Sequence, residues 1–295
     1  MGAVRRIVYV ASVTHGGSTL LDMLLSCHPC VCGVGEVARV LDPAVRAKLF
    51  QSGKSRRCSC GRAMTPQSDC PLWAPLIDRL EDAPPASTAE AYAALLGQVS
   101  AVAPQTEVVC DSSKSLGCLG ALVRALEDPL LAGVDLRVIH LVRDVRSFSM
   151  SRRARRKESR WAAYRRFGEW YRTNRRLEAA IERHGRPSFR LGYEELCLHP
   201  RAVLPALCEF LELDFVPEML DLARSQGHVG IGNPMRMDAV RSAAIQYDHR
   251  WFVDDTVGWV HLLRPRIRRY NRERVYARVP KPPRERRRGR PASRG

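Results

Sequence analysis

The segment from residue 7 to residue 25 constrains the fold of this chain more than any other. An apolar run at 7–11 predicts a buried strand, and a second apolar run at 20–25 predicts a helix. Between them lies a short turn made of Thr14, His15, Gly16, Gly17, Ser18 and Thr19. A strand, a tight turn and a helix in this order direct free backbone N–H groups and the positive end of the helix dipole at one point, and proteins bind phosphate in this way.

The same turn lacks a residue that nucleoside triphosphatases require. Their phosphate loop has the pattern G-x-x-x-x-G-K-[ST], in which the lysine contacts the β- and γ-phosphates. No lysine occurs between residues 7 and 25, and the two glycines of the turn are adjacent. We therefore expect a site for a single phosphate rather than for a triphosphate.

Strands alternate with helices along most of the chain. Buried strands are predicted at 7–11, 108–110, 137–142 and 189–191, and helices at about 20–27, 88–102, 116–127, 145–156, 161–183 and 200–211. This alternation predicts an α/β fold, a P-loop-like parallel sheet flanked by helices, with its ligand at the carboxyl ends of the strands. The segment 36–86 is rich in Cys, Pro and Ser and interrupts the alternation, so we expect it to be an insertion that covers the site as a lid.

Length and charge indicate one large domain followed by a basic tail. The domain is expected over 1–265, and no apolar run approaches the ~18–20 residues that cross a bilayer, so we expect a cytoplasmic protein. The net charge is +17, and residues 268–295 hold 12 Lys or Arg against 2 Glu, a surplus of 10. We expect residues 266–295 to be disordered. The stretch 143–186, in which aromatic residues alternate with arginines, is interpreted as an amphipathic helix rather than a stacking surface for nucleic acid.

The chain has ten cysteines, which is many for a protein of a reducing compartment. One group consists of Cys27, Cys30 and Cys32 near His28, and a second of Cys58, Cys60 and Cys70. The second group does not have a standard zinc spacing, and no fourth ligand lies nearby in the sequence. Free thiols are the default expectation, while a disulfide or a structural zinc stays open for the second group. No metal is expected at the phosphate site.

Five blocks of sequence together resemble the PAPS-dependent sulfotransferases, where PAPS is 3′-phosphoadenosine 5′-phosphosulfate. The glycine turn, with His28-Pro29 and Gly35-Glu36 after it, resembles their 5′-phosphosulfate loop, and residues 141–146 with Ser151 resemble their 3′-phosphate motif. The other blocks are 111–114, 193–196 with 209–211, and 232–236 with Asp248 and Trp251. The likeness spans about residues 5–260 and is nearest in motif to the tyrosylprotein and carbohydrate branch.

The resemblance implies residues that bind PAPS and its product, adenosine 3′,5′-bisphosphate (PAP). The chemistry of the residues agrees, because the turn offers backbone amides and Arg143 offers a planar fork that matches phosphate. Ser151 lies two helical turns further along and adds a hydroxyl on the same face. The hydroxyls of the turn are expected to donate to the 5′-phosphate. By the same resemblance, Tyr193 contacts adenine and Arg236 reaches the 3′-phosphate.

Transfer of a sulfuryl group requires an aligned hydroxyl, a base and positive charge on the leaving oxygens. The resemblance implies that Glu36 takes the proton of the acceptor, and Lys114 is the candidate cation for the transferring sulfonate. The family usually has Arg or Lys at the position of His15. A histidine there offers either an imidazolium for the bridging oxygen or a second candidate base.

Two other functions are consistent with parts of the sequence. The first is a P-loop-type kinase or NTPase, against which the missing lysine argues. The second is a non-catalytic nucleic-acid-binding protein that uses the basic helix and the tail. Solvated arginines explain this charge without nucleic acid, although RNA, acidic lipid and an acidic protein stay open as partners of the tail. The acceptor is predicted only as a hydroxyl on a small molecule, a glycolipid or a peptide.

Overall fold

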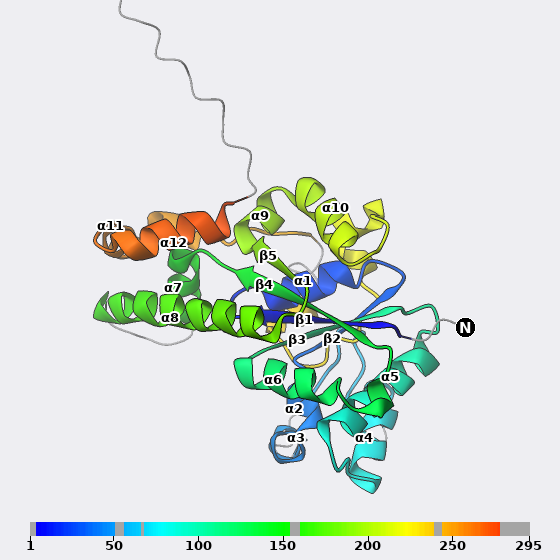
Figure 1. Ribbon diagram of the computed structural model, residues 1–295. Coiled ribbons are helices and arrows are strands. Elements are labelled where there is room, and N and C mark those ends of the chain that lie inside the picture. Colours follow the sequence, from blue (N-terminus) through cyan, green and yellow to red (C-terminus); the bar gives the residue numbers. More distant parts are fainter. Residues whose placement is uncertain (1–3, 51–55, 66–67, 154–159, 239–243, 278–295) are drawn as a thin grey trace, which may run out of the picture.

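The computed structural model describes residues 4–50, 56–65, 68–153, 160–238 and 244–277. Its centre is one sheet of five parallel strands in the order β2-β3-β1-β4-β5 (Figure 1). The strands are β1 (Arg6–Ser12), β2 (Val31–Gly35), β3 (Val108–Lys114), β4 (Asp135–Val142) and β5 (Ser188–Gly192). The chain therefore has the α/β fold that the alternation predicts.

Helices connect and cover the strands. They are α1 (Ser18–Leu25), α2 (Ala38–Leu41), α3 (Pro43–Phe50), α4 (Trp73–Asp82), α5 (Thr88–Val102), α6 (Leu116–Ala125), α7 (Val145–Arg153), α8 (Arg160–His184), α9 (Tyr193–Leu198), α10 (Pro200–Phe210), α11 (Asp255–Leu262) and α12 (Pro265–Val275). Short 3₁₀ helices lie at η1 (Pro129–Leu131), η2 (Pro217–Leu220), η3 (Leu222–Arg224), η4 (Pro234–Met237) and η5 (Arg250–Val253). None of the helices in the described ranges is long and apolar enough to cross a bilayer.

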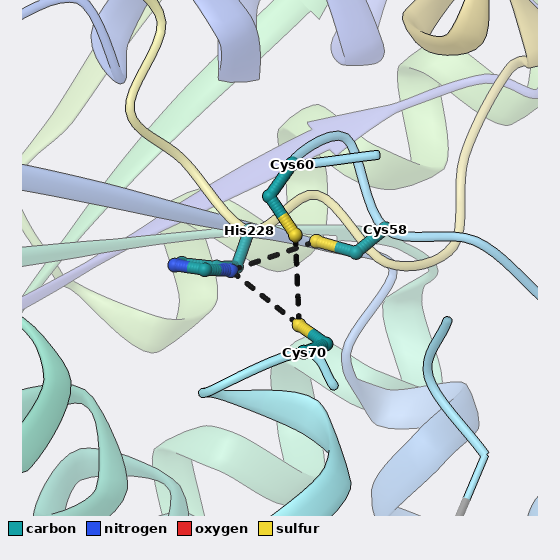
Figure 2. A group of neighbouring side chains, drawn as sticks. All are labelled: Cys58, Cys60, Cys70 and His228. Atoms are coloured by element: carbon teal, nitrogen blue, oxygen red, sulfur yellow. Dashed lines mark hydrogen bonds between the residues drawn. The ribbon is translucent and has the colours of Figure 1, made fainter. Parts of the chain in front are cut away.

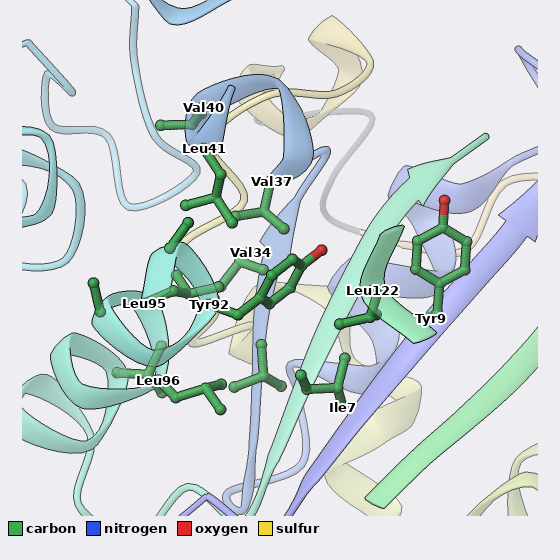
Figure 3. Close-up of a cluster of buried hydrophobic side chains, with 14 of the residues drawn as sticks. Ile7, Tyr9, Val34, Val37, Val40, Leu41, Tyr92, Leu95, Leu96 and Leu122 are labelled. Carbon is green, nitrogen blue, oxygen red and sulfur yellow. The ribbon is translucent and has the colours of Figure 1, made fainter. Parts of the chain in front are cut away.

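Both faces of the sheet are buried. Successive side chains of a strand point to opposite faces, so Ile7 and Tyr9 of β1 enter one core while Val8 and Val10 enter the other. The first core lies under α2, α4, α5 and α6, and the second under α1, α9 and α10 (Figure 1). Figure 3 shows part of the first core, where Tyr92 and neighbouring residues of α5 lie beside the sheet. A strand buried on both faces is an unbroken apolar run, which made 7–11 recognisable in the sequence.

Strand β2 is absent from the predicted strands, because the two glycines of its sequence VCGVG favour a turn over a strand. The structure corrects this: Gly33 and Gly35 belong to the strand. At Gly33, an added Cβ would lie 1.9 Å from Oδ1 of Asp22 in α1, so only glycine allows the helix and the strand to approach this closely. Gly35 has a φ of 76°, which turns the chain at the end of the strand.

Helix α12 corrects the expected boundary between domain and tail. Its residues fall within the predicted disordered segment 266–295, yet Ile267, Tyr270, Asn271 and Val275 are buried. Together these four form one stripe along the helix, and the surrounding arginines concealed that periodicity. Residues 278–295 lie outside the described residues, as does the expected end of the helix predicted at 145–156.

Two other expectations concern segments beside the core. In α8, Phe167 and Trp170 are fully buried, which confirms a packed stripe, whereas Trp161 is 79% exposed. In the predicted insertion 36–86, α4 is amphipathic and buries Trp73 and Leu76 against the first core. That helix is therefore part of the packed domain.

Candidate functional site

A cavity of about 420 Å³ lies at the carboxyl ends of the strands. Every strand contributes to its lining through the residues that end or follow it. These are the turn residues Thr14, His15, Gly17, Ser18 and Thr19 after β1, Glu36 after β2, Lys114 at the end of β3, Arg143 after β4 and Tyr193 after β5. Ser151 of α7 and a segment around Asp248 complete much of the remaining wall. The convergence predicted for the strand-end turns is confirmed.

The glycine turn brings backbone amides to the cavity. Gly17 is the N-cap of α1 and has a left-handed φ of 97°, a conformation that glycine adopts without strain. A Cβ at Gly17 would lie 2.2 Å from the Tyr193 ring, so the turn also has no room for a larger residue. The amides of Ser18 and Thr19 open the helix, where N–H groups have no partner inside the helix and face the positive end of the dipole.

Arg143 ties the two sides of the cavity together. Its guanidinium donates to the carbonyl of His15 at 2.9 Å, to Oγ of Ser147 at 2.8 Å and to Oδ2 of Asp248 at 2.7 Å. It also lies 4.5 Å from the centre of the Tyr193 ring. Only 7% of the side chain is exposed, so this cation is fixed in place by its partners.

Asp248 supplies a carboxylate at the position where Arg143 faces the cavity. Arg250 donates to both oxygens of this carboxylate at 2.6 Å. Burial acts to raise the pKa of Asp248, but Arg250 and Arg143 outweigh it and lower the pKa to about 2. The group is ionised at neutral pH, and it pairs with the cations that an anionic ligand would contact.

Glu36 and Lys114 form an ion pair inside the cavity. Nζ of Lys114 lies 2.5 Å from Oε1 of Glu36, and Arg39 donates to the other oxygen at 3.3 Å. Burial acts to raise the pKa of Glu36, but the charges of Lys114 and Arg39 outweigh it, so the pKa lies below its ordinary value. The carboxylate is therefore ionised and able to accept a proton.

The backbone that presents Lys114 is unusual. Lys114 has a φ of 71°, which is rare outside glycine and costs roughly 1–3 kcal/mol. The carboxylate of Asp111 accepts from the backbone N–H of Ser113 at 2.8 Å and from Tyr92 at 2.6 Å, and this bends the chain at the end of β3. The run Asp-Ser-Ser-Lys thus has a structural reason: its first residue fixes the turn that carries the lysine.

A buried carboxyl lies behind the cavity. Oδ2 of Asp22 accepts from the N–H of Gly35 at 3.0 Å and from Ser112 at 2.8 Å, while Oδ1 has no hydrogen-bond partner among the described residues. Burial raises the pKa of Asp22 to about 7, against the opposing effect of these hydrogen bonds. Asp22 joins α1 to β2 and β3 directly beneath the residues that line the site.

Two predicted cofactor residues do not line this cavity. Gly16 turns toward β1, where an added Cβ would lie 2.0 Å from Oγ of Ser12, so it shapes the turn without facing the cavity. Arg236 is a clearer correction, because its guanidinium donates to backbone carbonyls that include those of Val229, Gly230 and Arg57. These contacts occupy the guanidinium in holding neighbouring backbone segments together, and Arg236 is not among the residues that line the cavity.

Several lining residues escaped the sequence analysis. They include Arg39, Asn233, Gln246, Tyr247, His249 and Arg250. Asn233 lies in a block that the sequence did single out, and its backbone N–H donates to Oγ1 of Thr19 at 3.0 Å. Arg39 lies in the short helix α2 and Arg250 begins η5, whereas Gln246, Tyr247 and His249 come from an irregular segment without a periodic pattern. The position of these last three depends on tertiary packing. Of the predicted lid, Glu36 and Arg39 are the described residues that line the cavity, and the lid itself stays a prediction.

The geometry combines two kinds of anion-binding group with a carboxylate base and a lysine cation. Backbone amides at the start of α1 and the guanidinium of Arg143 suit two phosphate-like groups. The ionised Glu36 suits the removal of a proton, and Lys114 suits the neutralisation of developing negative charge. The volume falls within the roughly 300–1,000 Å³ that is common for small-molecule sites.

Comparisons with known proteins identify the family of this chain and folds that are similar to it. The model of a family described as "Sulfotransferase family" matches residues 8–217. The sulfotransferase domain from the Synechococcus PCC 7002 olefin synthase is similar in structure, with 21% identity and a TM-score of 0.51 over 89% of this chain and 96% of that domain. The sulfotransferase domain from the curacin biosynthetic pathway aligns with 16% identity and a TM-score of 0.43 over 89% of this chain and 97% of that domain. No match was found among curated protein sequences.

Proposed function

This chain belongs to the sulfotransferase family, and from that premise we propose that it transfers the sulfuryl group of PAPS to an acceptor hydroxyl. The observation that carries the choice of donor is the pairing of a glycine turn at a helix start with Arg143 in one cavity. PAPS has a phosphosulfate at the 5′ position and a separate phosphate at the 3′ position. A site for it needs two anion-binding groups held at a fixed spacing.

The residues present fit this donor. The amides of Ser18 and Thr19 would bind the 5′-phosphate, because they lie at the positive end of α1. Arg143, with Ser151 nearby on α7, would bind the 3′-phosphate. Tyr193 already contacts both the turn and the guanidinium, so its ring offers a flat surface between the two groups, suited to adenine.

Glu36 and Lys114 would carry out the transfer. In the direct displacement, the acceptor oxygen forms a bond to sulfur while the bond from sulfur to the 5′-phosphate oxygen breaks. Glu36 takes the proton of the acceptor hydroxyl, and PAP leaves with the electron pair of the broken bond. Lys114 neutralises the sulfonate oxygens and the leaving oxygen. When Lys114 turns toward the donor, Glu36 loses its main stabilising charge, so its basicity rises at the moment when the proton must be taken.

His15 is the third residue to which we assign a role in the transfer. Its backbone has a φ of 67°, a strained conformation that keeps its carbonyl on Arg143 and its side chain among the residues that line the cavity. We assign it to the bridging oxygen, where the protonated imidazole would stabilise the leaving group.

The acceptor is proposed only by class. A small molecule, a glycolipid and a peptide all present a suitable hydroxyl, and nucleic acid is not required as a partner. The predicted likeness to the tyrosylprotein and carbohydrate branch would favour the last two. We expect the segments 36–86 and 155–185 to select the acceptor, and residues 51–55, 66–67 and 155–159 of them lie outside the described residues.

The decisive experiment separates donor binding from turnover. We expect E36Q to lower kcat by ~10²–10⁴ while PAP binding, measured by calorimetry, is unchanged. The matched control is E81Q, which removes an exposed carboxylate at the far end of α4, and it should leave both quantities unchanged. H15A should lower kcat more than it lowers PAP affinity.

Each outcome has a definite meaning. A fully active E36Q enzyme would move the role of base to His15. Absence of any heat with PAP in the unmodified protein would overturn the proposed donor. Turnover that requires Mg²⁺ and ATP would favour the alternative of a kinase.

A further inference from the structure

Four side chains from two distant parts of the sequence meet outside the set of residues that line the cavity. Cys58, Cys60 and Cys70 come from the segment between α3 and α4, and His228 comes from the segment after η3 (Figure 2). Their ligand atoms all lie within 4.8 Å of one another. His228 is the fourth member that no local spacing in the sequence could reveal, because it follows Cys70 by 158 residues.

The distances match those of ligands around a single tetrahedral ion. Sγ of Cys60 lies 3.8 Å from Sγ of Cys70, and Nδ1 of His228 lies 3.6 Å from Sγ of Cys58 and 3.5 Å from Sγ of Cys70. With Zn–S bonds of ~2.3 Å and Zn–N bonds of ~2.0–2.1 Å, a regular tetrahedron places two sulfurs ~3.8 Å apart and a sulfur and a nitrogen ~3.6 Å apart. A disulfide would require its two sulfurs to lie at ~2.05 Å.

The surrounding backbone holds these ligands in place. The segment from Cys58 to Arg62 is a tight turn, in which Gly61 has a φ of 84° and donates to the carbonyl of Cys58 at 2.9 Å. Oγ of Ser59 donates to the carbonyl of Gly227 at 2.8 Å and accepts from the N–H of Val229 at 2.9 Å, so the turn is bound to both sides of His228.

Backbone amides also point at the sulfurs. The N–H of Arg62 bonds to the thiol of Cys60, and those of Leu72 and Trp73 bond to that of Cys70. Hydrogen bonds of this kind stabilise the negative charge of metal-bound thiolates.

We propose that Cys58, Cys60, Cys70 and His228 bind one Zn²⁺ ion in a structural Cys₃His site. Three thiolates and one imidazole complete a tetrahedron without an open position, and closed sets of this kind are structural rather than catalytic. The bound unit would carry a charge of −1. Arg236 lies close enough to Cys58 to interact with it electrostatically, so a cation accompanies the excess charge. Cys60 is exposed, which leaves the ion a path for entry.

The site would connect the segment 58–70 to the chain that supports Glu36. From His228 the backbone continues to Ile231, which pairs with Gly35 and accepts the N–H of Glu36 at 2.8 Å. The next residues are Gly232 and Asn233, which line the cavity. The ion would therefore brace one wall of the cavity from behind without contacting any substrate.

The metal content of the full chain tests the proposal. We expect close to one zinc per chain by inductively coupled plasma mass spectrometry after purification without added chelator. C70S and H228A should each lower zinc content by at least half, because a ligand is lost. The matched control is C118S, which replaces a half-buried cysteine of α6 outside the group and should keep the full zinc content.

A second measurement does not depend on the folding of variants. Stepwise titration of the unmodified protein with an organomercurial, with released zinc detected by a chromogenic chelator, should release the ion in proportion to thiols modified. Protein refolded with Co²⁺ alone should show the visible bands of tetrahedral cobalt and a thiolate charge-transfer band.

Three results would overturn the proposal: metal-free protein from zinc-supplemented cultures, full zinc content in folded C70S, or a disulfide between Cys60 and Cys70 in a non-reducing peptide map. None of them bears on donor binding, because metal content is measured without PAPS or acceptor.

Discussion

At the scale of single residues, Arg143 determines how an anion can enter the cavity. Each of its three guanidinium nitrogens donates a hydrogen bond, and one of these bonds goes to Asp248, a carboxylate that would compete with an incoming phosphate. The sequence pointed to Arg143 because it ends an apolar strand. It did not reveal Asp248 as the group that pairs with this arginine, since the two are 105 residues apart.

Replacing this carboxylate tests the competition. We expect D248N to bind PAP about tenfold more tightly, or ~1.4 kcal/mol, because like-charge repulsion is lost while a neutral hydrogen-bond acceptor remains. Calorimetry measures the change, and D82N, at an exposed position of α4, is the control. Weaker binding by D248N would show that the carboxylate instead positions Arg143 for the ligand.

At the scale of helices and strands, the carboxyl of Asp22 in α1 forms hydrogen bonds to both β2 and β3. A helix and two strands meet at a carboxyl whose pKa is raised to about 7 mainly by burial. The folded state holds the proton up to about that pH, while the unfolded chain releases it near pH 4. Stability from this group is therefore complete below about pH 4 and is lost as the pH rises toward 7.

We expect D22N to flatten this dependence. Its amide oxygen can keep the hydrogen bonds from Gly35 and Ser112 without the cost of burying a charge. Between about pH 4 and pH 8, the free energy of unfolding of D22N should rise by ~2–4 kcal/mol relative to the unmodified protein. Urea unfolding of both proteins at several pH values measures this difference. The contributions of the other buried carboxyls cancel, because both proteins contain them. Parallel pH curves would contradict the assignment.

The helices and strands also show where the local sequence is sufficient to predict an element. β1 and β4 were recognisable because they are largely apolar, whereas β2 is short and contains two glycines. Gly33 is explained by its contact with α1 and Gly35 by its φ of 76°. In α12, arginines outnumber the four buried residues, and the burial of Asn271 depends on a partner 127 residues earlier in the chain.

Asn271 provides a test of whether α12 belongs to the domain. Its side chain donates to Asp144 at 2.7 Å and accepts from the N–H of Val145 at 2.9 Å. N271A should lower the free energy of unfolding by ~2–3 kcal/mol, because a buried charged group and a helix N–H each lose a partner. R272A, on the exposed side of the same helix, should change it by no more than ~0.5 kcal/mol. Equal small effects in thermal or urea unfolding would mean that α12 does not pack as described.

At the scale of the whole molecule, the parallel sheet brings chemistry from distant parts of the chain to one place. Five strand ends supply about half of the lining residues, and the alternation of apolar runs was enough to predict this convergence for four of them. The group of Cys58, Cys60 and Cys70 with His228 was only partly predictable, because its last member depends on how the chain returns past the sheet. Residues that close a site from irregular segments have no periodic signal, and their positions follow from packing alone.

Net charge affects the whole molecule as well. With a surplus of 17 positive charges, the protein should attract a polyanionic donor from a distance. We expect the KM for PAPS to rise several-fold between about 0.01 M and 0.15 M salt, over which the screening length falls from ~30 Å to ~8 Å, with little change in kcat. Initial-rate measurements with a neutral acceptor test this. A constant KM would mean that only contacts inside the cavity attract the donor.

The bond from Arg143 to the carbonyl of His15 has a consequence for the choice of donor. Since the guanidinium and the glycine turn are joined, the protein itself sets the distance between the two proposed phosphate positions. A nucleotide without the 3′-phosphate, or with that phosphate moved to the 2′ oxygen, would satisfy one position and leave the other to water. The enzyme would thus discriminate among nucleotides by the distance between their phosphate groups more than by the identity of the base.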